Sequence, residues 1–396
     1  MPLTYDKLIK FDLFEQSEQE LKKEQYPELF SILNDINSIN KFIEDTPAYP
    51  GSTSKISRAE MVMSIGSTLA IEGILLDKDE IEESIRKAEM NDTLLRKEQE
   101  AENSHKVYQF IIGLVNAQRE NNSKFIYDEA TIKEIHNLFT RGLNYMSNEP
   151  GKYRNNFSTT FGEPRKIGLC KTESEVQEAM EKFVEWLNKE NTGSFADIAL
   201  IKAIMAHYYL SEIHPFGDGN GRTARALEAL ILHVNGINDY CFWSLANFWS
   251  ANKNEYLAHL GNITQNCNPW DFVLWGLKGF LQEINRIQKL VLKKIKRLML
   301  KDYTQWLLRD KKSQSIKINR RIEAIVDFLV KVDKIEFPDF LKTPQIAGLY
   351  INVSRMTKKR DLTKLKELEL IKYEEHNDIL YIMPNFNLLD HLVYRV

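Results

Sequence analysis

Apolar residues recur at helical spacing along most of the chain. Segment 201–208 places them at i, i+3, i+4 and i+7, and segment 227–234 repeats that spacing. Pro215 disfavours helical geometry at the residue before it, so the first helix should end near His214. Asn and Gly at 235–236 provide a stop for the second helix. The pattern predicts two buried helices joined by a loop.

The same spacing predicts a helix over 57–76, and the closely mixed charges of 78–102 are typical of solvated helix faces. Alternation typical of strands is scarce before the last quarter of the chain. A basic, polar stretch at 309–321 indicates a boundary between domains. The chain is therefore expected to be mainly α-helical.

Short elements follow this boundary, and turn residues separate them. Two strands are expected to flank an acidic turn. The last helix is strongly basic and follows a turn at 352–354 that contains an N-cap candidate. The predicted order is helix 322–330, helix 343–350, turn 352–354, basic helix 354–368, strand 371–373, turn 374–378 and strand 379–382.

Composition narrows the class of protein. The 396 residues are 43% hydrophobic and 28% charged, which favours two or three globular domains with a substantial core. The formal net charge of −3 implies no bulk attraction to nucleic acid or membranes. The sequence predicts neither a signal peptide nor a membrane span. Three scattered cysteines favour a reducing, cytoplasmic compartment.

The loop between the two buried helices reads HPFGDGNGRTAR, from His214 to Arg225. Its glycines allow positive φ and close approach of a ligand, and the helix that follows offers N–H groups to an anion. Arg222 and Arg225, three apart near a helix start, are unfavourable there unless an anion is bound. Asp218 is a carboxylate of the kind that holds Mg²⁺ beside phosphate oxygens, and His214 is a general-base candidate. These groups together predict nucleotide chemistry at a hydroxyl.

This loop resembles the signature of the Fic family, HxFx(D/E)GNGRxxR, at every specified position. The resemblance implies an all-helical core and transfer of AMP from ATP to a Ser, Thr or Tyr hydroxyl of a protein. It implies that His214 is the base, Phe216 a core anchor and Asp218 the Mg²⁺ ligand. The implied ATP contacts are Gly219, Asn220, Gly221, Arg222 and Arg225. Kinase-like relatives carry Lys where this chain has Gly221, which favours AMP transfer here.

Two further segments extend the resemblance. Family members place a β-hairpin flap ahead of the motif, where the target protein docks, and 151–168 has the corresponding position and composition. Tyr256 lies where relatives have an aromatic residue near the nucleotide, although an aromatic on a helix is as often part of the core.

Thr68, Glu72 and Gly73 resemble the family's inhibitory motif, (S/T)xxxE(G/N), on a helix that precedes the core. In relatives this glutamate pairs with the second motif arginine, here Arg225, where the γ-phosphate would lie. The resemblance implies autoinhibition, within one chain or across a homodimer.

The C-terminal pattern resembles a winged helix-turn-helix, which many Fic proteins carry at this end. Segment 343–382 could then contact DNA through its basic helix, or a protein, which its acidic turn favours. The predicted organisation is an N-terminal helical region 1–100, a Fic core 101–290, a helical linker 291–316 and a winged helix 317–396. Two alternatives to AMP transfer stay open: removal of AMP from a modified protein, and a nucleotide-sensing DNA-binding regulator.

Overall fold

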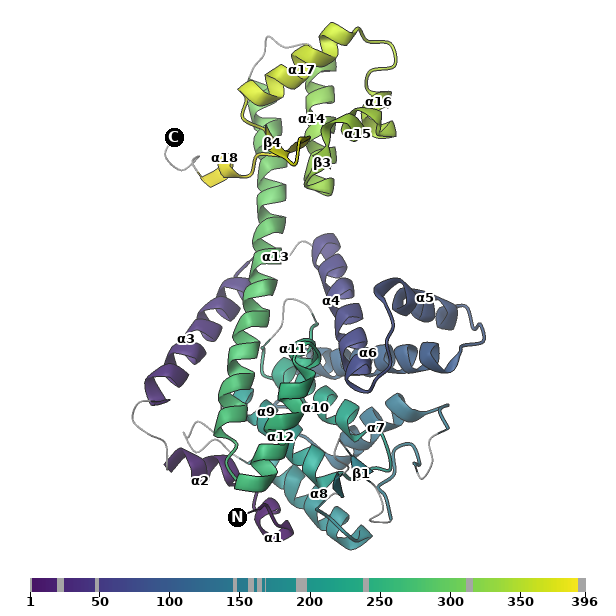
Figure 1. The fold of residues 1–396 in the computed structure, drawn as a ribbon, viewed down its shortest axis with the longest axis vertical. Coiled ribbons are helices and arrows are strands. Elements are labelled where there is room, and N and C mark those ends of the chain that lie inside the picture. Colours follow the sequence, from purple (N-terminus) through teal and green to yellow (C-terminus); the bar gives the residue numbers. More distant parts are fainter. Residues whose placement is uncertain are drawn as a thin grey trace. The chain divides into compact units, whose positions relative to one another are not determined.

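The computed structural model describes residues 2–19, 25–46, 50–144, 148–155, 160–161, 166–167, 169–189, 198–237, 242–310 and 316–390. Two compact units divide the chain, Met1–Arg286 and Ile287–Val396. Within the described residues, no helix combines the length and the apolar character needed to cross a membrane. The chain is mainly helical, as predicted (Figure 1).

The first unit holds twelve of the described helices entire, the start of another and two short strands. In chain order they are α1 (Tyr5–Leu8), α2 (Leu13–Gln19), α3 (Gln25–Glu44), α4 (Pro50–Ile71), α5 (Lys78–Glu89), α6 (Arg96–Glu120), α7 (Glu129–Thr140), β1 (Thr160–Phe161), β2 (Lys166–Ile167), α8 (Glu173–Asn188), α9 (Ala199–Ile213), α10 (Asn220–Val234), α11 (Ala246–Ala251), α12 (Lys253–Asn266) and the start of α13 (Trp270–Asp310).

Helices α9 and α10 form the centre of this unit, with the other helices gathered around them (Figure 1). Every residue of α9 except Ala199 and Lys202 is buried, and α10 is buried from Arg222 to His233. The predicted end of the first helix is confirmed, because His214 follows α9 in the left-handed conformation, with φ 50°. The loop between these helices is therefore held in the middle of the core.

Local signals fix several helix starts. Asp77 caps α5 and Thr172 caps α8, each in a capping box with the glutamate three residues later. The predicted solvated faces over 78–102 are wrong only at the end of that segment, at residues 100–102. Glu100 and Glu102 are 3% and 5% exposed, because α6 packs against α4, α7 and α10.

The end of α4 also differs from the prediction. The helix stops at Ile71 rather than at residue 76, and Gly73 follows in the left-handed region, with φ +85°. The N–H of Gly73 donates to Ala70 O at 3.1 Å, and that of Ile74 donates to Leu69 O at 3.0 Å. This pair of bonds is a Schellman motif, which places Glu72 at the last position before the chain turns away.

The predicted flap lies partly in the described residues. β1 and β2 are antiparallel, with Thr160 opposite Ile167 and Phe161 opposite Lys166. Residues 156–159, 162–165 and 168 lie outside the described residues. A strand pair is thus present where the hairpin was predicted.

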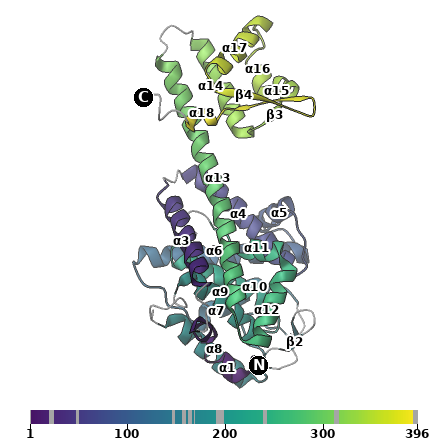
Figure 2. The same cartoon turned by 60° about the vertical axis from the view of Figure 1, so that its left-hand side comes forward.

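The second unit contains the rest of α13, α14 (Ile316–Val332), β3 (Ile335–Glu336), α15 (Phe337–Lys342), α16 (Pro344–Gly348), α17 (Arg355–Glu367), β4 (Ile371–His376), β5 (Ile379–Pro384) and α18 (Asn387–Asp390). The strands form an antiparallel sheet in the order β3-β5-β4. Figure 2 shows this sheet beside the helices that precede it.

Two predictions for this region are wrong. Residues 291–316 are not a separate linker, because Leu300 and Leu308 of α13 lie in the core of the second unit. The acidic turn predicted at 374–378 is shorter, because β4 continues to His376. Asn377 and Asp378 alone make the turn, both with positive φ, as a type I′ hairpin turn requires.

Candidate active site

The loop between α9 and α10 is shaped by two left-handed residues. His214 has φ 50° and Gly219 has φ 77°; Gly219 is also the N-cap of α10. The first hydrogen bond of α10 runs from Thr223 N to Gly219 O, at 3.0 Å. The N–H groups of residues 220–222 therefore come before the intrahelical ladder, where an anion is favoured.

Asn220 holds the loop closed. Its Oδ1 accepts from Phe216 N at 2.8 Å, and its Nδ2 donates to Phe216 O at 2.9 Å. Phe216 itself is fully buried, in keeping with the anchor expected at that position. The amide of Asn220 is thus engaged by the loop, so the expected anion contact falls to its backbone rather than to its side chain.

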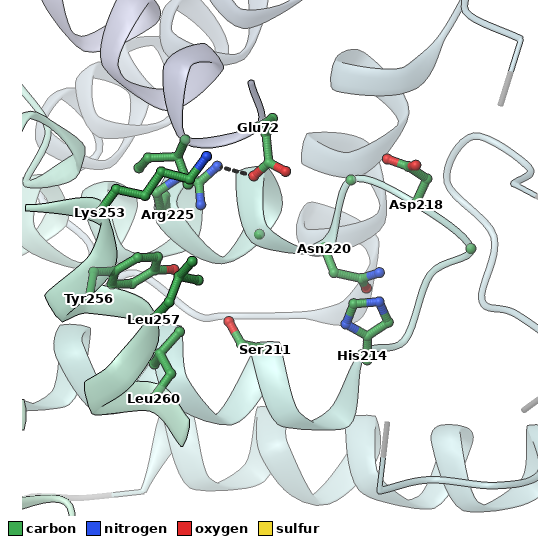
Figure 3. A pocket seen from close by; sticks show the side chains of 14 residues that line it. Glu72, Ser211, His214, Asp218, Asn220, Arg225, Lys253, Tyr256, Leu257 and Leu260 are labelled. Carbon is green, nitrogen blue, oxygen red and sulfur yellow. Dashed lines mark hydrogen bonds and ion pairs between the residues drawn. The ribbon is translucent and has the colours of Figure 1, made fainter. Parts of the chain in front are cut away.

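One cavity of about 430 Å³ lies against this loop, in the first unit (Figure 3). It is lined by Ile71, Glu72, Ser211, His214, Gly217, Asp218, Gly219, Asn220, Gly221, Arg225, Lys253, Tyr256, Leu257 and Leu260. Most of the site residues expected from the sequence therefore meet in one place. Thr68, Gly73, Phe216 and Arg222 are outside the lining.

His214 is 7% exposed at the floor of this cavity. Burial, followed by the positive charge of Arg154, lowers the pKa of His214 to about 3. The imidazole is therefore neutral at pH 7, which is the state that accepts a proton.

Arg154 fixes the backbone around that histidine. Its Nε donates to His214 O at 2.6 Å, one Nη2 bond reaches Cys170 O at 2.6 Å, and its backbone N–H donates to Pro215 O at 2.8 Å. The sequence interpretation missed Arg154, because it belonged to the predicted flap and no local pattern links it to the loop.

Asp218 and Arg222 form an ion pair, with Nη2 and Oδ1 2.9 Å apart. Nη1 of Arg222 lies 3.1 Å from Oε2 of Glu100 on α6. Arg222 is 3% exposed. Arg222 does not line the cavity, and its guanidinium pairs with Asp218, which does, and with Glu100. The ATP contact expected of Arg222 stays a prediction.

Arg225 is 1% exposed and lies opposite Glu72 (Figure 3). Its Nη2 is 2.5 Å from Oε1 of Glu72, while its Nε donates to Thr68 Oγ1 at 3.0 Å and Nη2 to Thr68 O at 3.3 Å. Burial would raise the pKa of Glu72, but the charges of Arg225 and Arg222 and the hydrogen bond from Arg225 hold it below its usual value. Glu72 is thus a carboxylate that neutralises the deepest cation of the cavity.

Gly221 lies directly under this pair. A Cβ placed on it would meet Glu72 Oε1 at 3.0 Å and Arg225 Nη1 at 3.1 Å. The backbone approaches the carboxylate as closely as it would approach a ligand, which is the role expected of a glycine here.

Tyr256 is 3% exposed and belongs to a buried polar chain behind the cavity. Its hydroxyl is 2.9 Å from Nε2 of His207, whose Nδ1 is 2.6 Å from Oε2 of Glu228. Trp249 Nε1 donates to the same carboxylate oxygen at 3.1 Å. His207 and Glu228 are fully buried, and sequence reasoning treated their helices only as core.

The apolar part of the lining was also missed. Leu257 and Leu260 follow Lys253 at i+4 and i+7, so they share one face of α12. That spacing was visible in the segment around Tyr256 and could have identified the whole wall.

The site can hold a divalent metal only when a bound nucleotide supplies further oxygen atoms. Within the described residues, no three His, Cys, Asp or Glu side chains gather to hold a metal ion. Asp218 offers one carboxylate, 42% exposed, at the edge of the cavity. One carboxylate completed by phosphate oxygens and water is how Mg²⁺ is usually held with nucleotides.

Comparison with known proteins agrees with this geometry. Residues 126–232, from just before α7 to within α10, match the Fic/DOC family model. This chain contains a Fic/DOC domain. Curated relatives include "Protein adenylyltransferase Fic" of Drosophila willistoni, 34% identical over 188 residues, and that of Drosophila virilis, 33% identical over 191 residues. These alignments cover 44% of this chain and 35% and 36% of the two relatives, so the chain spans about a third of their length.

Solved structures share the fold. A Fic family protein from Desulfovibrio desulfuricans G20 has a TM-score of 0.55 and 20% identity, and the match covers 90% of this chain and 96% of that one. Fic-1 from C. elegans has a TM-score of 0.50 and 21% identity, with 71% of this chain and 82% of that one covered. These solved structures thus share the fold of the Fic/DOC domain and of the helices around it.

Proposed function

We propose that this protein transfers AMP from ATP to a hydroxyl side chain of a protein, and that Glu72 holds the site in an inhibited state. The observation that carries the proposal is the joint lining of one cavity by His214, Asp218, Arg225 and Glu72. The names of the curated relatives support the reaction, and the intact Fic/DOC loop supports catalysis here.

The residues of the cavity account for each part of the transfer. Neutral His214 takes the proton of the target hydroxyl as the oxygen bonds to the α-phosphorus. The bond from that phosphorus to the bridging oxygen breaks, and pyrophosphate leaves. The N–H groups at the start of α10 and its dipole stabilise the charge that develops on the phosphoryl oxygens. Asp218 would hold Mg²⁺, which when bound neutralises the charge of the phosphates.

The inhibited state follows from the two possible partners of Arg225. An arginine buried to 99% needs a counter-charge, and Glu72 supplies it in place of a phosphate. A preference of about 3 kcal/mol for the paired state would suppress transfer roughly a hundredfold, at about 1.4 kcal/mol per decade. In this proposal autoinhibition depends on whether Arg225 binds the Glu72 carboxylate or a phosphate.

The strand pair β1–β2 is proposed as the docking site of the target protein. β1 and β2 are short antiparallel strands, and an extended peptide could pair with them as a further strand. The target would then dock on the predicted flap, 151–168, which also contains Arg154, the donor to His214 O.

The second unit is proposed to be a winged helix-turn-helix that contacts a partner through α17. The observation in favour is a row of exposed basic residues, namely Arg355, Lys359, Arg360 and Lys366. The hairpin beside it carries Glu374 and Glu375, and Lys372 is already paired with Glu374 at 2.8 Å. DNA binding would be salt-dependent and lost on reversing the charges of α17, whereas a protein contact would involve the hairpin as well.

The reaction is tested with ATP labelled on the α-phosphate, supplied with Mg²⁺ to the wild type, Glu72→Gly and His214→Ala. Label on protein that requires His214 supports AMP transfer. Absence of label in every variant contradicts it. Release of AMP from a modified protein by the wild type, with no label incorporated by Glu72→Gly, would instead favour AMP removal.

A further inference from the structure

His136 of α7 lies under the motif loop and contacts it in two ways. Its ring is fully buried and stacks on Phe216, with centroids 3.7 Å apart and planes 4° from parallel. Its Nε2 is 2.9 Å from Asp218 O. A Cβ on Gly219 would meet Thr140 Cγ2 at 3.0 Å and His136 Cδ2 at 3.5 Å, so the loop is pressed against α7.

The other ring nitrogen binds a different segment. Nδ1 of His136 accepts from Gly151 N at 3.0 Å. Gly151 opens the segment 151–154, which leads toward β1. Three residues later, Arg154 donates to His214 O at 2.6 Å. This segment is therefore tied to both ends of the motif loop, through Arg154 at His214 and through His136 at Asp218.

The partners of His136 determine its hydrogen placement. A backbone N–H can only donate, so Nδ1 must be the acceptor for Gly151. A carbonyl oxygen can only accept, so Nε2 must carry the hydrogen that it shares with Asp218 O. Only the neutral Nε2–H tautomer makes both bonds. The two bonds are chemically distinct, which allows them to be removed separately.

We propose that His136 is a positioning residue that couples the segment leading into the strand pair to the motif loop. The coupling keeps a docked target in register with His214 and with the nucleotide bound beside Asp218. This inference rests on the proposed function, since it concerns the alignment of target and nucleotide in the same reaction. A purely structural role would instead require only that the buried ring fill its place beside Phe216.

Three substitutions in a Glu72→Gly background separate these possibilities. His136→Asn keeps an acceptor where Nδ1 lies and loses the donor to Asp218. His136→Gln keeps a donor where Nε2 lies and loses the acceptor for Gly151. His136→Phe keeps the stacked ring alone. Two readouts are measured: hydrogen exchange at the Gly151 amide without nucleotide, and automodification with α-labelled ATP, with its rate and its dependence on ATP concentration.

The proposal predicts that the Gly151 amide stays protected in His136→Asn and exchanges faster in the Gln and Phe variants. It also predicts that His136→Phe transfers label at least about tenfold more slowly at saturating ATP, because misplacement of reacting groups is costly, while half-saturation by ATP moves less than about threefold. The Asn and Gln variants should each recover part of the rate.

An unchanged exchange rate at Gly151 in the Gln variant would overturn the coupling, as would a parental transfer rate in His136→Phe. The exchange measurement needs no catalysis. If the Glu72→Gly parent itself incorporates no label, the proposed function fails, while the exchange result still decides whether His136 joins the two segments. If the Phe variant does not fold, the Asn and Gln pair still gives opposite exchange results.

Discussion

The backbone of Gly221 lies within a methyl group's reach of the Glu72 carboxylate: a Cβ at this position would be 3.0 Å from Oε1. Glu72 and the start of α10 thus share a space that would have to receive a phosphate when Glu72 leaves. The relationship gives a direct test of whether carboxylate and phosphate compete for one position.

Adding Gly221→Ala to Glu72→Gly is expected to weaken ATP binding by about tenfold or more, because the methyl group enters the space vacated by the carboxylate. Titration calorimetry with ATP and Mg²⁺ measures the effect, and the single Glu72→Gly variant is the reference. Equal affinities in the two variants would mean that the phosphate lies elsewhere. Thermal unfolding of both variants checks that the fold is kept.

Gly73→Ala should weaken the Glu72–Arg225 ion pair without changing either residue. Gly73 has φ +85°, a conformation that costs an L-residue about 1–2 kcal/mol, so the turn that presents Glu72 is strained by the change. Automodification is expected to rise by about three- to tenfold, measured as the initial rate of label incorporation. Gly113→Ala in α6 is the matched control, since nothing lies within 4 Å of its added Cβ and its rate should stay unchanged. A fall in rate for Gly73→Ala would contradict the presentation role of this turn.

Glu228→Ala should destabilise the first unit strongly. It leaves His207 and Trp249 without their shared carboxylate in a fully buried site, and breaking such a buried pair costs about 3–5 kcal/mol. Denaturant unfolding measures the loss. Glu82→Ala removes an exposed pair with Lys78 and should cost less than about 1 kcal/mol. Similar losses in the two variants would show that the buried chain does not stabilise the core.

The sequence located the motif loop because its residues are contiguous and chemically distinctive. Glu72 was reached through a resemblance. It lies at a helix end because the Schellman turn at Gly73 stops α4 at Ile71, five residues before the end that the apolar periodicity predicted. One of the two carboxylates paired with Arg222 belongs to Glu100, 122 residues away, and no local pattern encodes that contact. The mixed charges of 78–102 made Glu100 look solvated. Burial of a carboxylate depends on which helix packs against it, so this contact required the tertiary structure.

Stability should fall as the pH drops from about 6.5 toward 4, in part through His233. Burial, and to a smaller extent the charge of Arg119, lowers the pKa of His233 to about 4. Between these pH values the imidazole of His233 is protonated in the unfolded chain and neutral in the folded state, so protonation stabilises the unfolded state. Above about pH 6.5 the imidazole is neutral in both states, and its contribution to the free energy of unfolding is constant. Melting temperatures of wild type and His233→Gln across pH 7 to 4 measure this. The variant's melting temperature should decline less steeply, and parallel curves would exclude His233 as a source of the acid sensitivity.

We propose that Glu72 suppresses AMP transfer by occupying Arg225. The most direct measurement is the initial rate of AMP incorporation from α-labelled ATP, at saturating ATP and Mg²⁺, for the wild type and Glu72→Gly. An increase of about tenfold or more is expected in Glu72→Gly, and it should be lost when Arg225→Ala is added. Equal rates in the wild type and Glu72→Gly would contradict it.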